Sequence, residues 1–407
     1  VTQGVVSRVG FTNYSHSLKY LLTVQIDAAI NDGNSGGPCL DKNYKVVGVA
    51  FQGIEDADNI GYCIPVRVIH HFIKSYHKDA SKAYSVPCLA LVYSNIENQA
   101  MKQYLNMIKN TENENEKHVQ TADVNDEHYD FDGEMQGILV DKLYPFTDTA
   151  ERLKKGDVIL QIEGTAIGDD GTIKYGKNSR IDLNYIITNK FDGDSVELRV
   201  LRQAKILNVK VEIRRHNPLC AVHLYDSTEE YFIFGGLVFL PLSRPYLQHK
   251  FGRDSWTKKA PSTLTYAYFN RLRSSPLQQC IVLTQVLAFD EINVGYQDYR
   301  HDILECIECG RDEHGKEKQF KIDNLAHLAH TVDELAARRR DQQKSQGKEE
   351  KFIKFKFESQ HTIVLNIDDV LHAAADILQR YKIQFDRSKN LRSTQQQTDD
   401  QKTNDTK

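Results

Sequence analysis

The sequence predicts a mostly β protein with α+β modules, and three observations lead to that prediction. A length of 407 residues corresponds to about two to four domains. Short apolar runs separated by glycine-containing breaks recur in the first 75 residues and in two later stretches, as is typical of strands. Apolar spacing typical of helices is confined to a few segments. The 40% of hydrophobic residues is enough for several modest cores.

The composition argues against several functional classes. A net charge of −4, from 52 basic and 56 acidic residues, gives no electrostatic case for a nucleic-acid partner. No apolar run approaches the ~20 residues of a membrane-spanning helix. The seven cysteines are odd in number and scattered, which does not suggest a secreted disulfide framework. We therefore expect an intracellular, reducing compartment, with the organelle left open.

The first predicted domain covers residues 1–80. Strand-like runs precede and follow the segment "QIDAAINDGNSGGP" (residues 25–38). Residues 66–78 place apolar side chains at helical spacing after Pro65, a residue suited to a helix start. This order predicts half of a β-barrel closed by a helix.

Two further domains and a tail are expected. Residues 84–215 contain strand-like runs interrupted by a polar stretch at about 109–134, which predicts a disordered insertion. Residues 180–191 are expected to be a helix. Residues 218–386 combine strands with two helical segments, and the polar residues 387–407 predict a disordered tail.

The segment 31–38 is the most informative for chemistry. Glycines at 33, 36 and 37 permit backbone conformations that aim successive amides at one point, as an oxyanion hole requires. The string "QIDAAINDGNSGGP" resembles the nucleophile loop of chymotrypsin-fold serine proteases, in particular the HtrA/Deg branch. The resemblance implies that Ser35 is the nucleophile and that the amides of Gly33 and Ser35 form the oxyanion hole.

The same resemblance places the catalytic His and Asp ahead of the Ser, in the first barrel and the segment after it. Only 34 residues precede Ser35, and they offer His16, Asp27 and Asp32. His16 lies in a polar loop at the wrong spacing for a base from another barrel. Asp27 is expected to anchor a strand end. We therefore interpret the chain as the C-terminal part of a longer protease, with the nucleophile as the one triad member it carries.

Residues 33–37 also fit the nucleophile elbow of α/β-hydrolases, with Asp56 or Asp58 and then His70 following in the order of that fold. An elbow needs a helix directly after the serine. Pro38 and the strand-like residues 45–51 disfavour this alternative.

Residues near the nucleophile line the S1 pocket in the resembled fold. They correspond here to Ile30, Val49, Ala50 and Phe51. Because no Asp stands at the pocket base, the resemblance implies a small or medium apolar P1 side chain.

The string "LKKGDVILQIEG" (residues 153–164) resembles a PDZ domain, and "GGLVFLPLSRP" (residues 235–245) resembles the start of a second PDZ unit of plant-type Deg proteases. PDZ domains bind extended peptides by strand addition and hold the C-terminal carboxylate on backbone amides. The corresponding loop of the first unit is residues 87–90, where Pro87 removes a donor. In the second unit it is Gly235, Gly236, Leu237 and Val238, which we expect to capture the carboxylate.

Cys306 and Cys309, flanked by His301 and His314, leave a zinc site as an alternative to a plain β-hairpin. The spacings match no standard finger, and the hairpin is favoured.

The resemblance implies a fold made of the C-terminal barrel of a chymotrypsin-like protease domain followed by two PDZ-like domains. The implied activity is an ATP-independent serine endopeptidase acting on unfolded or damaged proteins in quality control, with no metal or organic cofactor. Homo-oligomers, trimers or multiples, are also implied. The alternative is a catalytically inactive PDZ chaperone or adaptor that keeps only the binding surfaces.

Overall fold

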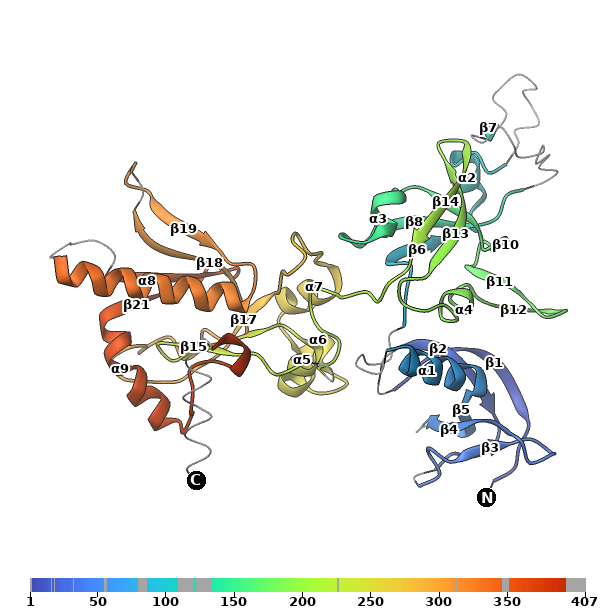
Figure 1. Cartoon of the computed structure of the whole chain (residues 1–407), viewed down its shortest axis with the longest axis horizontal. Coiled ribbons are helices and arrows are strands. Elements are labelled where there is room, and N and C mark those ends of the chain that lie inside the picture. The colour runs from blue at the N-terminus through green and yellow to red at the C-terminus, as the bar shows by residue number, and fades with distance from the viewer. Residues whose placement is uncertain are drawn as a thin grey trace. The chain divides into compact units, whose positions relative to one another are not determined.

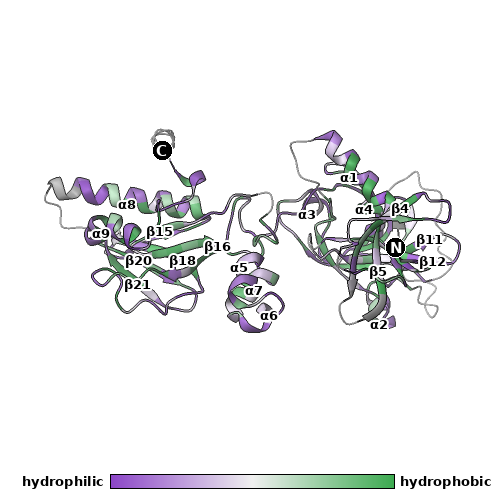
Figure 2. Ribbon diagram, turned by 90° about the horizontal axis from the view of Figure 1, so that it is seen from below, coloured by the Kyte–Doolittle hydropathy of each residue, from purple (hydrophilic) through white to green (hydrophobic). Residues whose placement is uncertain are grey.

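The computed structural model describes residues 2–15, 17, 19–31, 33–54, 57–79, 86–108, 120–121, 134–224, 227–311, 313–345 and 351–392. The chain divides into two compact units, Val1–His216 and Asn217–Lys407 (Figure 1). In both units the strands carry most of the hydrophobic residues (Figure 2). None of the helices in these described ranges is long and apolar enough to cross a membrane.

The first part of unit 1 is a five-stranded antiparallel sheet closed by a helix, as the sequence predicts. The strand order is β1-β2-β5-β4-β3. Its elements are β1 (Val6–Asn13), β2 (Tyr20–Ile26), β3 (Pro38–Leu40), β4 (Val46–Ile54), β5 (Ala57–Pro65) and α1 (Val66–Lys78). The nucleophile segment is the connection between β2 and β3.

The second part of unit 1 is a sheet of order β6-β8-β9-β13-β14-β7, with β10 beside β9 and a separate hairpin of β11 and β12. The turn into β9 forms as expected, because Gly156 has a positive φ of 93° and the buried Asp157 accepts a hydrogen bond from the amide of Lys154. Arg202 holds the same carboxylate with two bonds of 2.7 Å. The elements are β6 (Leu91–Asn95), α2 (Gln99–Tyr104), β7 (Gln120–Thr121), β8 (Ile138–Leu143), α3 (Asp148–Arg152), β9 (Val158–Ile162), β10 (Thr165–Ala166), β11 (Thr172–Tyr175), β12 (Ser179–Asp182), α4 (Asn184–Ile187), β13 (Ser195–Arg202) and β14 (Lys205–Glu212).

The helix expected over residues 180–191 is largely wrong. Residues 179–182 form β12, which pairs with β11, and only α4 is helical. Ile181 pairs with Ile173, and both side chains are buried in the same core. The strand pairing therefore overrides the helical spacing at the start of this segment.

Helix α1 docks onto the residues that follow α4 within unit 1. Arg67 donates to the side-chain carbonyl of Asn189 at 3.0 Å and to the Tyr185 hydroxyl. His71 is hydrogen-bonded through Nε2 to the carbonyl of Lys190 at 3.0 Å and stacks on Phe191, with ring centroids 4.4 Å apart. Burial lowers the pKa of His71, and the bond to the Lys190 carbonyl offsets part of that shift.

Unit 2 is built on a sheet of order β15-β16-β17-β18-β20-β21, with β19 beside β18. Helices α8 and α9 pack on its core, and α5 to α7 form a smaller cluster around the buried Trp256. The elements are β15 (Phe232–Phe234), β16 (Leu237–Pro241), α5 (Arg244–Phe251), α6 (Trp256–Lys259), α7 (Ser262–Asn270), β17 (Ile281–Val286), β18 (Asp302–Arg311), β19 (Glu317–Lys321), α8 (Leu325–Ser345), β20 (Phe352–Phe357), β21 (Thr362–Asn366), α9 (Ile367–Arg380) and the 3₁₀ turn η1 (Lys389–Leu391).

The expectation of a disordered tail from residue 387 is wrong for residues 387–392. Residues 387–392 are described and packed: the amide of Ile233 donates to the carbonyl of Asp386 at 2.7 Å, and the amide of Ser388 donates to the carbonyl of Tyr231 at 3.0 Å. Residues 393–407 lie outside the described residues, as does most of the expected insertion at 109–134. Within that insertion, β7 pairs in parallel with β14.

Candidate functional site

The nucleophile loop is held against β4 by two backbone hydrogen bonds. The amide of Gly36 donates to the carbonyl of Ala50 at 2.7 Å, and the amide of Ala50 donates to the carbonyl of Gly37 at 2.9 Å. Gly33 and Gly36 have φ values of 96° and 86°, a region that disfavours any residue with a Cβ. The glycines therefore allow the backbone to reverse twice around an exposed Ser35.

The amides of this loop divide into two sets. Those of Asn34, Gly36 and Gly37 each donate to a backbone carbonyl, of Asn31, Ala50 and Asn34 respectively. Among the described residues, no acceptor is recorded for the amides of Gly33 and Ser35. These are the two donors that the resemblance assigns to an oxyanion hole.

Several residues near the loop have structural contacts. Asp27 directly follows β2 and accepts a hydrogen bond from the amide of Val5 at 2.6 Å, so it anchors the chain ahead of β1. The side-chain carbonyl of Asn34 is buried without a hydrogen-bond partner. The Ser35 hydroxyl makes no recorded hydrogen bond within the described part of the chain. His16 and Asp32 lie outside the described residues, and the exposed His70 is on α1.

The four expected S1 residues do not share one surface. Ala50 bonds the nucleophile loop, and Ile30 packs on Gly61, where a Cβ would lie 2.8 Å from Ile30 Cγ1. Phe51 instead packs on Tyr14, with ring centroids 4.5 Å apart, in a separate cluster. Alternation along β4 places Val49 and Ala50 on opposite faces. Phe51 is therefore directed to that cluster, whereas Val49 pairs with Pro38 at the end of the loop, and Ile30, Val49 and Ala50 remain candidates.

The first PDZ loop leaves a sheet edge open. The amide of Cys88 donates to the carbonyl of Arg214 at 3.2 Å, and Ala90 has a φ of 52°. Strand β6 then pairs with β8 on one side. No strand among the described residues pairs with its other side. An extended peptide can add to this free edge.

The second PDZ loop, where the sequence predicts carboxylate capture by Gly235, Gly236, Leu237 and Val238, is a tight hairpin turn. Phe234 pairs with Leu237 across the two glycines, whose φ values of 57° and 82° match a two-residue primed turn. Strand β15 therefore occupies one edge of β16, and β17 occupies the other. Residues 386–388 cover the outer edge of β15 in turn. No edge of β16 is left for strand addition.

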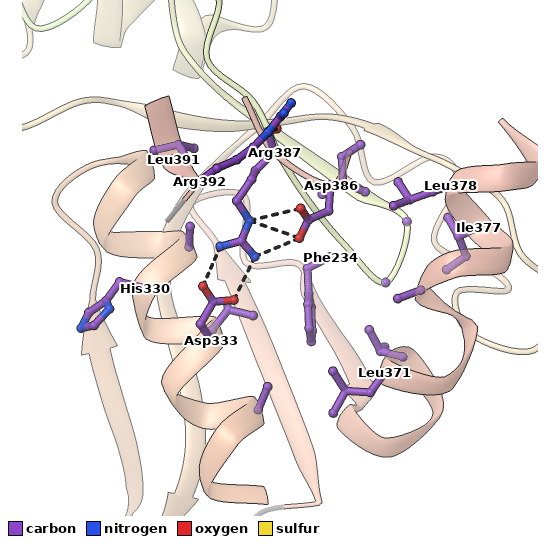
Figure 3. A pocket seen from close by; sticks show the side chains of 18 of the residues that line it. Phe234, His330, Asp333, Leu371, Ile377, Leu378, Asp386, Arg387, Leu391 and Arg392 are labelled. Atoms are coloured by element: carbon purple, nitrogen blue, oxygen red, sulfur yellow. Dashed lines mark hydrogen bonds and ion pairs between the residues drawn. The ribbon is translucent and has the colours of Figure 1, made fainter. Parts of the chain in front are cut away.

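A cavity of about 680 Å³ lies between α8, α9 and residues 386–392, with Gly235 and Gly236 at its wall (Figure 3). Arg387 bridges it: Nη1 and Nη2 donate to Asp333 of α8 at 2.6 and 2.9 Å, and Asp386 accepts from the same guanidinium. The bond to Asp333 raises the pKa of Arg387 further above its ordinary value. The hairpin turn at Gly235 and Gly236 has a signal in the sequence. Two adjacent glycines between two apolar runs are a hairpin signature.

The zinc alternative finds no support in the hairpin of β18 and β19. Cys306 and Cys309 are three residues apart on β18, an odd separation that directs side chains to opposite faces. Cys309 lies in the main core of unit 2. Within the described residues no group of three His, Cys, Asp or Glu side chains could hold a metal ion.

Comparisons with known proteins agree with this division. Residues 3–73 match the model described as Trypsin, and residues 114–213 and 220–390 match two models described as PDZ domain. The chain is 32% identical to "Protease Do-like 2, chloroplastic" of Arabidopsis thaliana, over 96% of this chain and 56% of the relative. It is 31% identical to "Putative protease Do-like 3, mitochondrial" of the same plant, over 97% and 60%. It is 26% identical to "Serine protease DegP homolog" of Plasmodium falciparum, over 82% and 45%.

The chain thus spans 56% and 60% of the two Arabidopsis relatives. Among solved structures, it is similar to "HtrA-type protease AlgW with tripeptide", with 22% identity, a TM-score of 0.37, and coverage of 53% of this chain and 60% of that one.

A trypsin-like segment with a Gly-Asn-Ser-Gly-Gly loop, followed by two PDZ domains, defines the architecture of a modular serine protease. The chain belongs to the HtrA/Deg family, in the form that carries two PDZ domains.

Proposed function

We propose that this chain carries the nucleophile of a serine endopeptidase that acts on unfolded or damaged proteins. The observation that carries the proposal is the pattern of amides around Ser35. Three amides of the loop are used internally, whereas those of Gly33 and Ser35 have no recorded acceptor among the described residues. Two open donors flanking an exposed hydroxyl suit a tetrahedral oxyanion.

In this mechanism Ser35 Oγ attacks the scissile carbonyl, and the amides of Gly33 and Ser35 donate to the oxygen that becomes negative. Because the loop is fixed to β4 before substrate binds, these donors need little reorganisation. The base that accepts the Ser35 proton is not among the histidines that the described structure brings to the loop. We assign that role to a histidine, held by an acid, outside the described residues.

We further propose that substrate segments bind at the first PDZ domain. Its strand β6 has an edge without a strand partner among the described residues, whereas β16 of the second PDZ domain is paired on both sides. Backbone pairing along β6 would hold an extended peptide whatever its sequence, which suits unfolded chains.

Assembly and location follow from the relatives. We propose a homo-oligomer, a trimer or a multiple of one, as in the resembled family. We also propose an intracellular location, since two of the relatives carry the words chloroplastic and mitochondrial in their names. The seven cysteines, none of which is in a disulfide bond, suit a reducing compartment.

The test is a serine-directed fluorophosphonate probe applied to the natural full-length protein, with a casein-like substrate in parallel. We expect Ser35→Ala to lose labelling and turnover while substrate affinity stays within about twofold, because the hydroxyl contributes little to ground-state contact. Ser17→Ala, a serine outside the loop, is the matched control and should keep both. Labelling that persists in Ser35→Ala would show that another residue is the nucleophile. A parent protein that binds substrate but never labels would favour the inactive adaptor.

A further inference from the structure

Two cysteines face each other behind the nucleophile loop. Cys39 lies on β3 and Cys63 lies on β5, 24 residues further along, and their Sγ atoms are 2.7 Å apart. A disulfide bond joins its sulfur atoms at about 2.05 Å. The separation of the two sulfur atoms therefore exceeds a disulfide bond length by only about 0.7 Å.

Gly48 makes this approach possible. Strand β4 runs between β3 and β5, with Gly48 opposite Cys39 and Ala50 opposite Cys63. Positions 48 and 50 are on one face of the strand, so both cysteines approach over that face. A Cβ at Gly48 would lie 3.4 Å from the Cβ of Cys63 and 2.6 Å from the carbonyl oxygen of Ile64. The absent side chain leaves room for the two sulfur atoms to meet.

The two thiols differ in access. Cys63 is 4% exposed, and burial together with the neighbouring Cys39 raises its pKa to about 12. Cys39 is half-buried and is the sulfur that a reagent from solvent can reach. In unit 2, by contrast, Cys220 and Cys280 are both buried, at 2% and 4% exposure, so neither offers such an entry point. Because only Cys39 is accessible from solvent, Cys39 should react with the oxidant before Cys63 does.

We propose that Cys39 and Cys63 form a reversible disulfide site whose oxidant is a small disulfide such as glutathione disulfide. The Cys39 thiolate attacks one sulfur of the oxidant, the S–S bond of the oxidant breaks, and one glutathione thiolate leaves. Cys63 gives up its proton and attacks the Cys39 sulfur of the mixed disulfide, and the second glutathione thiolate leaves. Two protein thiols are oxidised, and one glutathione disulfide is reduced to two glutathiones that take up the two released protons.

The site is joined to the nucleophile loop through Ala50. This residue faces Cys63 in the sheet and exchanges hydrogen bonds with Gly36 and Gly37, while Cys39 follows the loop directly after Pro38. A bond between Cys39 and Cys63 would tie both ends of this arrangement to β5. The loop should then open less often. An effect of the bond on hydrolysis rests on the proposed function, whereas formation of the bond is independent of it.

The bond is tested on the folded chain in glutathione buffers of increasing oxidised fraction, with free thiols blocked by iodoacetamide and the peptides identified by mass spectrometry. The same chain unfolded in urea serves as the reference. We expect the Cys39–Cys63 peptide to exceed every other cysteine pair by about tenfold in the folded chain and to lose that excess in urea. The same distribution of pairs in both samples, or a Cys39 that stays open to iodoacetamide, overturns the proposal.

Two variants separate the steps. Cys63→Ala should stop at a mixed disulfide between Cys39 and glutathione, whereas the control Cys88→Ala should leave the Cys39–Cys63 bond unchanged. Hydrogen exchange at the amides of Gly36 and Ala50 should slow on the order of tenfold upon oxidation of the parent chain. It should not change in Cys63→Ala. A bond that forms without slower exchange would refute the link to the loop and leave the disulfide site standing.

Discussion

Gly235 shows how one absent side chain determines the architecture of unit 2. A Cβ at this position would lie 2.6 Å from Leu365 Cδ1 and 3.0 Å from Val370 Cγ2. The buried side chain of Asn293 donates to the carbonyls of Gly235 and Leu287, at 2.8 Å each. The turn is therefore packed against the core at Gly235, and its carbonyl is held by the buried Asn293.

Gly235→Ala is expected to lower the free energy of unfolding by about 1–2 kcal/mol for a left-handed residue and by a further ~1–3 kcal/mol for overpacking. Gly295→Ala is the matched control, because Gly295 also has a positive φ, 87°, but no neighbour within 4 Å of a built Cβ. Urea unfolding of both variants measures the difference. Equal losses would show that the space around Gly235 adapts.

The backbone reversal of the loop at residues 31–38 could be anticipated from sequence because the information is contiguous. Ser35 and its two open amides lie within three positions, and the glycines determine the local backbone. Phe51 could not be placed in the same way. A register shift between Ala50 and Gln52 interrupts the alternation of β4, and Tyr14, which directly follows β1, supplies a competing contact.

At the scale of elements, pairing between strands determines which segments become strands, and a local sequence pattern does not report that pairing. The hairpin of β18 and β19 follows from apolar runs and a turn, as the sequence predicts. Residues 180–191 are expected to be a helix, yet β12 forms at their start because β11 offers a partner. The pairing of β15 with residues 386–388 joins segments about 155 positions apart, and no local pattern reports such a contact.

Because residues 386–388 cover the edge of β15, we expect the two PDZ domains to differ in peptide binding: the first should bind an extended peptide and the second should not. An extended peptide carrying a photo-crosslinker should label residues 91–95, at the open edge of β6, and spare residues 232–241. Free-acid and amidated forms should bind within about threefold of each other, because Pro87 and the bonded Cys88 amide leave few donors for a carboxylate. Crosslinks in β16, or a strong preference for the free acid, would contradict this expectation.

At the scale of the whole molecule, the trypsin-like part and the first PDZ domain are joined into one unit by the docking of α1. Arg67 and His71, one turn apart on α1, both contact residues 185–191. Leu22 of β2 also contributes to the core cluster of the PDZ domain. A change at the PDZ domain therefore has a physical route to the barrel strands.

His71 should make this unit less stable in mild acid. Burial lowers its pKa below the ordinary value of 6.5, so the unfolded chain takes up the proton first as the pH falls. The stability is therefore fully present above about pH 6.5 and is lost as the pH falls through the lowered value, by at most about 1.4 kcal/mol per pH unit.

Urea unfolding between pH 5 and 8 measures this loss in the parent chain and in two variants. His71→Gln keeps an N–H donor for the Lys190 carbonyl but cannot titrate, so its profile should be flatter than that of the parent. His70→Gln, on the exposed side of α1, is the control and should follow the parent. Parallel profiles for His71→Gln and the parent would exclude His71 as the source of the acid sensitivity.

The contact between Tyr231 and Ser388 also bears on how unit 2 is made by the ribosome. The chain is synthesised from its N-terminus, so β15 leaves the ribosome long before residues 386–388 exist. During that interval the outer edge of β15 carries unpaired amides and carbonyls beside Phe232 and Phe234, a surface that pairs readily with other nascent chains. Translation past residue 388 is therefore the event that ends this vulnerable period, and a stop codon a few codons earlier would make it permanent.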